Sequence, residues 1–196
     1  FLKIMEEEAG RMSRLIDDLL SLSRVEVDEH IIPDERVPLL EVVKSVIASL
    51  EPRAARRQMG IVLVDDRPSR SNRPVMYGFS DEIKEVFHNL IENAIKYGFE
   101  GTDIHIHISA GEAGHVRVCV TNTGEVIGEN HLGRLTERFY RVDKARSRQI
   151  GGTGLGLAIV KHIVNRHRGT MEITSSDEGV TTFAVSLPVI AGQRAL

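Results

Sequence analysis

The chain has 196 residues, of which 41% are hydrophobic and 27% charged, and its formal net charge at pH 7 is −3. This length suits one α/β domain with an appendage, and the charge gives no reason to expect nucleic acid as a partner, which usually needs a basic face. The single cysteine, Cys119, excludes an intrachain disulfide, and its apolar neighbours predict a small buried side chain in a reducing cytoplasm. The sequence shows neither an apolar run of the roughly 18 residues that span a membrane nor a basic signal-peptide leader.

The first predicted element is an amphipathic helix over residues 2–27. Its apolar residues recur at heptad spacing and widen into a broad stripe: Met5, Met12, Leu15, Ile16, Leu19, Leu20, Leu22 and Val25. Charged residues off this stripe, Arg14, Asp17 and Asp18 among them, are expected to face water. Such a helix cannot bury its apolar face alone, so it predicts partner helices from elsewhere or from a second copy.

A proline-containing run over residues 31–34 ends this helix and marks the best domain boundary. We therefore expect a helical appendage over residues 1–30, a linker over 31–35, a compact domain over 36–190 and a tail over 191–196.

Three further helices are predicted in that domain. One begins near Leu40 and is expected to stop at or near Pro52. Ser80 or Asp81 can cap the next, which places apolar residues at helical spacing: Ile83, Val86, Phe87, Leu90 and Ala94. The last covers residues 155–167.

Strands follow from β-branched runs and from alternation of apolar and polar residues, over residues 61–64, 104–109, 116–120, 171–174 and 181–187. The second and third of these form a hairpin. Helices and strands segregate as in an α+β fold, a two-layer sandwich with one mixed sheet covered by helices on one face. The long irregular segment over residues 122–153 is typical of a lid or a binding loop.

One helix carries a polar ridge beside its apolar stripe. Asn89, Asn93 and Lys96 share a face, with Tyr97 beside them. An amide oxygen can take one magnesium position, and a lysine supplies a point charge to phosphate. A solvated helix face is the alternative interpretation.

A second feature is the glycine-rich run Gly151–Leu157, which leads directly into the last helix. Its glycines let the backbone approach a ligand closely, and a helix N-terminus presents unpaired N–H groups to an anion. The spacing differs from that of a P-loop or a dinucleotide fingerprint. A flexible hinge is the alternative, but it explains less well why an apolar helix follows at once.

These segments resemble, in order, the sequence boxes of sensor histidine kinases. Residues 89–97 resemble the N box, residues 137–143 the F box and residues 152–161 the second glycine box, while residues 11–24 look like the second helix of the dimerisation domain. The helix and linker look most like phosphate-regulon sensor kinases. The resemblance implies the Bergerat-type ATP-binding fold, with residues 1–30 as part of a dimerisation helix.

The same resemblance implies ATP and Mg²⁺ as cofactors and assigns roles position by position. Asn93 would ligate magnesium with support from Asn89, Arg141 would reach the γ-phosphate, and Lys96 and Tyr97 would flank the nucleotide. The other implied binding residues are Asn122, Gly124, Gly152, Thr153, Gly154, Leu155, Gly156 and Leu157. The remaining basic residues of the lid are interpreted as solvated surface: Arg134, Arg138, Lys144, Arg146 and Arg148.

Three positions depart from the family pattern. Asn122 stands where an aspartate accepts a hydrogen bond from adenine, and the loss of charge weakens that bond by on the order of 1 kcal/mol. Val126 stands where glycine is usual, so a positive φ there would be strained. Thr136 replaces a phenylalanine, and looser lid packing is expected. Together they predict weak or lid-dependent binding and leave a degenerate site as an alternative.

None of the eight histidines is followed by Asp or Glu, as the phosphoacceptor of the family is. The resemblance therefore implies transfer of the γ-phosphate to a histidine outside this sequence, and then to a response regulator. It also implies a second kinase subunit as partner through the first helix, and a cytoplasmic domain attached to a membrane only through upstream segments. His105 and His107 share a strand face and could hold a metal, although a polar strand face is the favoured interpretation.

Two other functional classes stay open. One is an ATPase of the same superfamily, whose water-activating glutamate would stand four residues before the magnesium asparagine, where this chain has Asn89. The other is a pseudokinase or pure interaction module.

Overall fold

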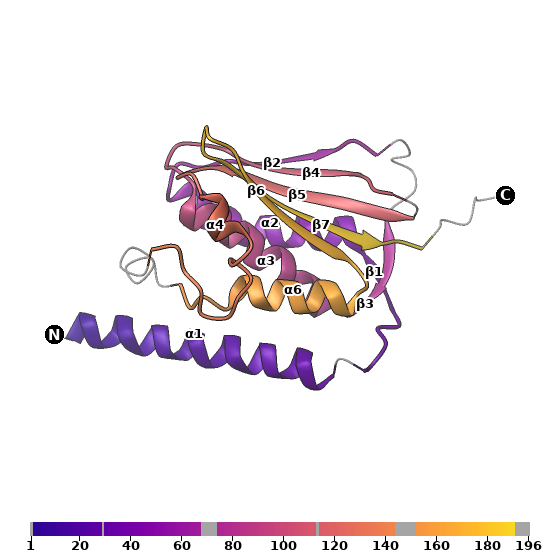
Figure 1. The fold of residues 1–196 in the computed structure, drawn as a ribbon, viewed down its shortest axis with the longest axis horizontal. Coiled ribbons are helices and arrows are strands. Elements are labelled where there is room, and N and C mark those ends of the chain that lie inside the picture. Colours follow the sequence, from indigo (N-terminus) through magenta and orange to yellow (C-terminus); the bar gives the residue numbers. More distant parts are fainter. Residues whose placement is uncertain (1, 29, 68–73, 113, 144–151, 191–196) are drawn as a thin grey trace.

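The structure is a computed structural model that describes residues 2–28, 30–67, 74–112, 114–143 and 152–190 (Figure 1). Three sets of sequence predictions lie outside these residues: Gly151, the lid residues Lys144, Arg146 and Arg148, and the tail over 191–196. Within the described part, no helix combines the length and the apolar composition needed to cross a membrane. The proposed division into appendage, linker, domain and tail stays a prediction.

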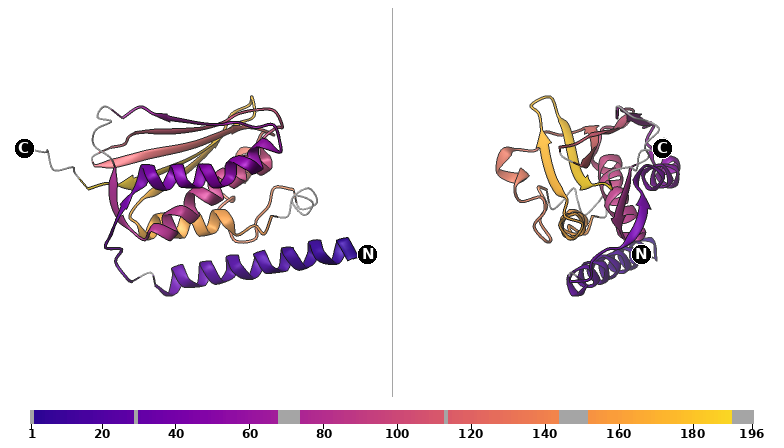
Figure 2. Two further views of the ribbon diagram at one scale, coloured as in Figure 1. Left: turned by 180° about the vertical axis from the view of Figure 1, so that it is seen from behind. Right: turned by 90° about the vertical axis from the view of Figure 1, so that its right-hand side faces the viewer.

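A five-stranded sheet forms one layer. Its strand order is β2 (Ile61–Asp65), β4 (Ile104–Ala110), β5 (His115–Thr123), β7 (Val180–Pro188) and β6 (Thr170–Ser175). β2 runs parallel to β4 and the other neighbours are antiparallel, so the sheet is mixed. Helices α2 (Leu39–Ala55), α3 (Ser80–Tyr97) and α6 (Gly156–Arg166) cover one face of the sheet (Figures 1 and 2), which confirms the predicted α+β sandwich.

The period of two in the strands decides which side chains enter the core. Ile106 in β4 and Val118 in β5 are fully buried. The residues that alternate with them along each strand face away from the helices. Cys119 is one of these outward residues and is only half-buried, so the prediction of a buried cysteine is wrong. Its apolar neighbours lie on the opposite face of the same strand.

The helices of the body are α2 (Leu39–Ala55), α3 (Ser80–Tyr97) and α6 (Gly156–Arg166). α2 continues past Pro52 because the buried side chain of Ala54 holds its last turn on the core. α3 begins after Phe79, and neither Ser80 nor Asp81 caps it through its side chain. The acidic first turn faces the positive end of the helix dipole in place of a cap.

Two short strands were not expected from the sequence. β1 (Glu35–Pro38) and β3 (Val75–Gly78) pair as a separate antiparallel sheet. Each has four residues and they lie far apart in the sequence, so no local pattern indicates the pairing. The segment predicted to be irregular is also shorter, because β5 extends to Thr123 and α4 (Glu129–Leu132) follows it.

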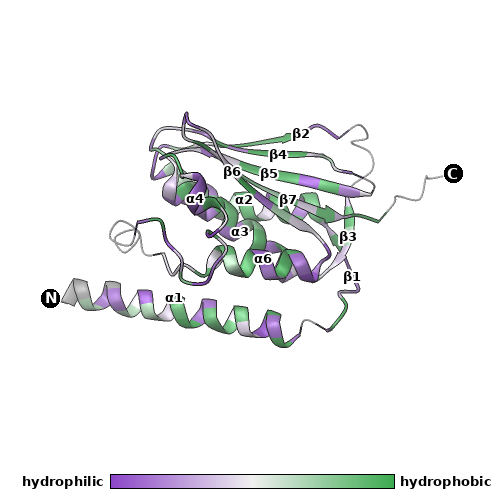
Figure 3. Ribbon diagram, in the orientation of Figure 1, coloured by the Kyte–Doolittle hydropathy of each residue, from purple (hydrophilic) through white to green (hydrophobic). Residues whose placement is uncertain are grey.

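Helix α1 (Leu2–Val27) has the predicted bounds and lies alongside α6 (Figures 1 and 2). Leu22 and Val25 are buried against the body, whereas Met12, Ile16 and Leu20 are exposed. Figure 3 shows hydrophobic and hydrophilic residues mixed along this helix. One part of its apolar stripe therefore packs on the body, and the rest is left open for another helix.

Candidate functional site

A cavity of about 740 Å³ lies between α3, the lid and the start of α6, within the ~300–1,000 Å³ that is typical of ligand pockets. Nearly all of the predicted site residues line it: Asn89, Asn93, Lys96, Tyr97, Asn122, Gly124, Arg141, Gly152, Thr153, Gly154, Gly156 and Leu157. Leu155 does not line it, because this residue is fully buried in the hydrophobic core at the start of α6. The cavity brings the residues together, and their individual roles stay predictions.

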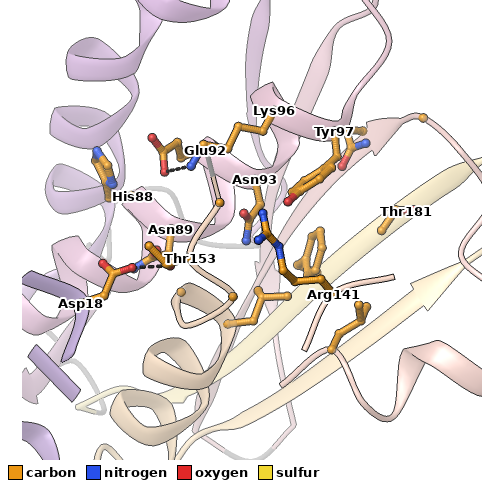
Figure 4. A pocket seen from close by; sticks show the side chains of 18 of the residues that line it. Asp18, His88, Asn89, Glu92, Asn93, Lys96, Tyr97, Arg141, Thr153 and Thr181 are labelled. Carbon is orange, nitrogen blue, oxygen red and sulfur yellow. Dashed lines mark hydrogen bonds and ion pairs between the residues drawn. The ribbon is translucent and has the colours of Figure 1, made fainter. Parts of the chain in front are cut away.

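The polar ridge of α3 forms one wall of the cavity. Asn89, Asn93 and Lys96 come from this helix (Figure 4), whose apolar residues are buried on its other side. The side-chain amide of Asn89 donates a hydrogen bond of 3.1 Å to the Glu85 carbonyl one turn earlier, which fixes its orientation. Its oxygen faces the start of α6.

The glycine-rich segment forms the facing wall, and two of its glycines are needed for close packing. A Cβ on Gly156 would lie 2.6 Å from Oδ1 of Asn89. Gly154 has a φ of +78°, and a Cβ there would lie 3.0 Å from Cα of Phe139 in the lid. The Gly154 carbonyl also accepts a hydrogen bond of 2.9 Å from the Phe139 N–H. The ridge, the glycine segment and the lid therefore meet at one place.

Helix α1 also reaches this site, through Asp18. The Thr153 hydroxyl donates to the Asp18 carboxylate and accepts a hydrogen bond of 3.3 Å from the Leu155 N–H. Burial raises the pKa of Asp18, and the hydrogen bond from Thr153 opposes this rise. The prediction that Asp18 faces water is therefore wrong, because docking of α1 on the body turns this side chain into the cavity (Figure 4).

Two more contacts hold α1 beside the site. The Ser21 hydroxyl donates to Glu85 of α3 at 2.6 Å, and Arg138 of the lid pairs with Glu26. Burial raises the pKa of Glu85 as well, and the Ser21 hydrogen bond opposes the rise. The carboxyl groups of Asp18 and Glu85 are thus half-buried where α1, a helix that the sequence places outside the domain, packs on the body.

The ammonium group of Lys96 is not a bare cation. It donates to Glu92 at 2.8 Å, and Arg53 of α2 pairs with the same carboxylate. Burial would raise the pKa of Glu92, but the hydrogen bond and charge of Lys96, together with the charge of Arg53, hold it below its ordinary value. Sequence reasoning did not single out Glu92, although its spacing to Lys96 is the one that pairs charges along a helix.

At the end of the cavity away from Asp18 and Thr153, strands β5 and β7 close it. Asn122 and Thr181 are opposite each other in register, line the cavity and are only 4% and 3% exposed. Phe183 and Ile127 add apolar surface nearby. The sequence did not indicate Thr181 as a site residue. The alternation along its strand shows only which face of the sheet its side chain occupies.

The expected strain at Val126 is absent. Among the described residues other than glycine, a positive φ occurs at Gln58, Phe139 and Arg168 only. Val126 therefore fits its backbone without the left-handed conformation that only glycine adopts easily.

In the lid, Arg141 lines the main cavity and Thr136 borders a second cavity of about 260 Å³. The Thr136 hydroxyl accepts a hydrogen bond of 3.4 Å from Lys161. Arg134 pairs with Glu137 at 3.2 Å on the exposed surface. The expectation of looser lid packing at Thr136 stays a prediction.

Among the described residues, the possible histidine metal site shows no third ligand. Within the described ranges no group of three or more His, Cys, Asp or Glu side chains is placed to hold a metal ion. His107 instead pairs with Asp66 at 2.6 Å.

Residues 78–191 match the family described as histidine kinase-, DNA gyrase B-, and HSP90-like ATPase. The phosphate regulon sensor protein PhoR of Pseudomonas aeruginosa is 39% identical over 184 residues, which are 93% of this chain and 40% of that protein. The sensor-like histidine kinase SenX3 of Mycolicibacterium smegmatis is 34% identical over 188 residues, covering 96% of this chain and 47% of that protein. The chain thus spans less than half the length of these relatives.

Among solved structures, full-length ShkA in complex with AMPPNP has a TM-score of 0.80 over 96% of this chain and 38% of that chain, at 23% identity. At this identity the likeness shows the shared fold. The predicted fold and the resemblance to sensor histidine kinases, phosphate-regulon sensors among them, are confirmed.

Proposed function

This chain belongs to the histidine kinase-, DNA gyrase B- and HSP90-like ATPase family, and on that premise we propose that it is the ATP-binding catalytic part of a two-component sensor histidine kinase. The kinase would transfer the γ-phosphoryl group of ATP to a histidine outside this sequence. The observation that supports this most strongly is that Asn93 and Gly154 line one cavity.

The residues present fit a magnesium-bound nucleotide. Asn93 offers an amide oxygen inside the cavity, and oxygen ligands are those that Mg²⁺ prefers. The start of α6 faces Asn89 with only the hydrogen of Gly156 between them, so the first N–H groups of that helix lie beside the ridge. Magnesium, when bound, would neutralise negative charge on the phosphates.

The chain itself would bind and orient the nucleotide. Lys96 would supply positive charge to the phosphates, sharing its ammonium group with Glu92. Arg141, from the lid, lines the same cavity and would bind the terminal phosphate. Phosphoryl transfer needs little covalent chemistry from such a domain, since positioning and charge stabilisation contribute most.

Asn89 argues against hydrolysis as the main reaction. Its carboxamide cannot act as a general base toward water. It is also held by the Glu85 carbonyl and packed against Gly156. A pseudokinase remains the competing proposal, and Asn122 is the observation that favours it.

Partners follow from the same proposal. The exposed apolar residues of α1, Met12, Ile16 and Leu20, support pairing with further helices in a second kinase subunit. The phosphoryl group would then pass to a response regulator. A membrane-anchored sensor with this chain on its cytoplasmic side completes the proposal.

The test combines titration calorimetry with γ-labelled ATP. The chain is expected to bind Mg-ATP with micromolar-to-millimolar affinity, to release little inorganic phosphate and to acquire no acid-labile label. Steady ATP turnover would favour the ATPase. No heat of binding and no nucleotide-dependent rise in melting temperature at millimolar Mg-ATP would favour the pseudokinase, because a bound ligand stabilises the folded state by mass action.

A further inference from the structure

We infer that the cavity accepts 6-oxopurine nucleotides, such as those of inosine, as well as adenine nucleotides, and that Asn122 is the residue that sets this breadth. The inference rests on the proposed function, because it concerns the base of the nucleotide whose phosphates lie at the helix end of the cavity.

The position of Asn122 assigns it to the base and not to the phosphates. The groups that favour anions, Lys96 and the start of α6, lie toward the end where Asp18 and Thr153 meet (Figure 4). Thr181, the register partner of Asn122, lies on the far side of Asn93 and Arg141 from that end. A nucleotide with its phosphates at the first end therefore places its base at the second.

The surroundings of Asn122 suit a flat heterocycle. Phe183, Ile127 and Leu157 give the cavity apolar surface, and Tyr97 stands at its rim. Gly124 leaves room for the amide, since a Cβ there would lie 3.3 Å from Nδ2 of Asn122. Among the described residues, Asn122 and Thr181 are the buried polar side chains that face this cavity.

The chemistry of a carboxamide then determines which bases fit. Asn122 carries one acceptor oxygen next to one donor nitrogen, and rotation of the side chain exchanges the two. Adenine presents an amino donor beside an N1 acceptor, while a 6-oxopurine presents an oxygen acceptor beside an N1–H donor. The carboxamide can pair with both edges. An ionised carboxylate has acceptors only, so it would repel the oxygen of a 6-oxopurine.

Thr181 does not restore the discrimination. Its hydroxyl lies 3.2 Å from the Ser175 hydroxyl, and either of these groups can be the donor. It can therefore present an acceptor or a proton to the base. Both buried polar groups at this end are thus adaptable, and neither carries a charge that would favour one purine.

The experiment measures the affinities of the intact chain for Mg-ATP and Mg-ITP by titration calorimetry, with Mg-CTP as a non-purine reference. ITP is chosen because it has the 6-oxo group without the 2-amino group of guanine. We expect the two purine affinities to agree within about tenfold, since a mismatched base pairing costs roughly tenfold to a hundredfold. ATP binding with ITP weaker by clearly more than about tenfold would overturn the inference and leave the proposed function standing. If none of the three nucleotides binds, the inference and the proposed function are both overturned.

The variant Asn122→Asp sharpens the test. Mg-ATP binding should be kept or strengthened, while Mg-ITP binding should fall by at least about tenfold relative to Mg-ATP. The matched control is Asn165→Asp, the same chemical change on the exposed side of α6, which should leave the ratio of the two affinities unchanged. An unchanged ratio in Asn122→Asp, with its fold verified by circular dichroism, would contradict the role of Asn122. If that variant does not fold, the wild-type ratio still decides.

Discussion

The two ends of the cavity are built in different ways. At the sheet end, Asn122 and Thr181 project from neighbouring strands, and the ladder of β5 and β7 fixes their spacing. At the helix end, charged and polar groups converge from separate elements: Lys96 from α3, Asp18 from α1 and the hydroxyl of Thr153 from the glycine segment. The two buried polar side chains of the sheet end are neutral, and the helix end is charged and assembled by docking.

This difference indicates which end can be regulated. The sheet end depends on backbone pairing and should keep its shape in every state of the domain. The helix end depends on whether α1 is docked, because Asp18 and Glu85 are held between α1 and the body. On the proposed function, the sheet end would set the selectivity for the base, and the docking of α1 would modulate the strength of phosphate binding.

The largest expected effect is at the centre of the cavity. Asn93→Ala removes the amide oxygen proposed to hold magnesium and should weaken Mg-ATP binding by about tenfold to a hundredfold. Calorimetry in the presence of Mg²⁺ and of EDTA checks it, since the variant should lose most of the dependence on magnesium. Identical binding curves for the wild type and the variant would show that Asn93 does not contribute to Mg-ATP binding.

A second, smaller effect is expected from a substitution in the glycine segment. Gly154→Ala forces a positive φ on alanine and brings its Cβ to 3.0 Å from the backbone of Phe139. We expect about 1–2 kcal/mol of destabilisation from the backbone conformation and a loss of nucleotide affinity on the order of tenfold.

Gly101→Ala is the control for this change, because Gly101 has a φ of +79° with nothing within 4 Å of a Cβ. It should show the destabilisation, measured by urea unfolding, without the loss of affinity. Equal affinity losses in both variants would mean that the contact with the lid does not matter.

The third prediction concerns the charge balance at the helix end. Glu92→Gln should strengthen Mg-ATP binding several-fold, on the order of 1 kcal/mol, because it releases Lys96 and removes a half-buried negative charge. The gain should shrink as salt is added. Glu100→Gln, an exposed change outside the cavity, serves as the control and should leave the affinity unchanged. A weaker affinity in Glu92→Gln would contradict the prediction and show that Lys96 needs Glu92 to hold it in position.

The smallest effect is the pH dependence of α1 docking. Burial raises the folded-state pKa of Asp18 and of Glu85, so both carboxyls favour the protonated folded form. Their contribution to stability is present below their unfolded pKa values and is lost as the pH rises through the raised ones. Glu92 acts in the opposite sense, because its pKa is lowered, and its contribution is lost in acid.

Urea unfolding between about pH 4 and pH 8 checks this balance. Asp18→Asn should flatten the decline of the unfolding free energy with rising pH, by less than about 1 kcal/mol. Glu6→Gln removes a charge from an exposed position near the start of the same helix and should leave the slope as in the wild type. A steeper slope in Asp18→Asn would contradict the assigned pKa direction.

The sequence predicts those parts of the site that depend on local periodicity. Helical spacing places Asn89, Asn93 and Lys96 on one face of α3 because a helix repeats every 3.6 residues. The glycines before α6 predict a close backbone approach, and the structure has one at Gly154 and another at Gly156.

The rest of the site depends on how distant segments meet. Asp18 has the heptad position of a solvated residue, and only the docking of α1 brings it to Thr153. Leu155 belongs to a glycine-rich motif, but the position at the N-terminus of α6 directs its side chain into the core. Thr181 enters the site through the register of β7 on β5, which no single segment encodes.

The most direct test is amide chemical-shift mapping of the labelled chain titrated with Mg-ADP. We expect the largest shifts to appear together, at the same nucleotide concentrations, in the ridge over residues 89–97, in the glycine segment over residues 152–157 and at Asn122. Shifts confined to one wall, or clustered away from the cavity, would contradict a nucleotide held between α3 and the start of α6.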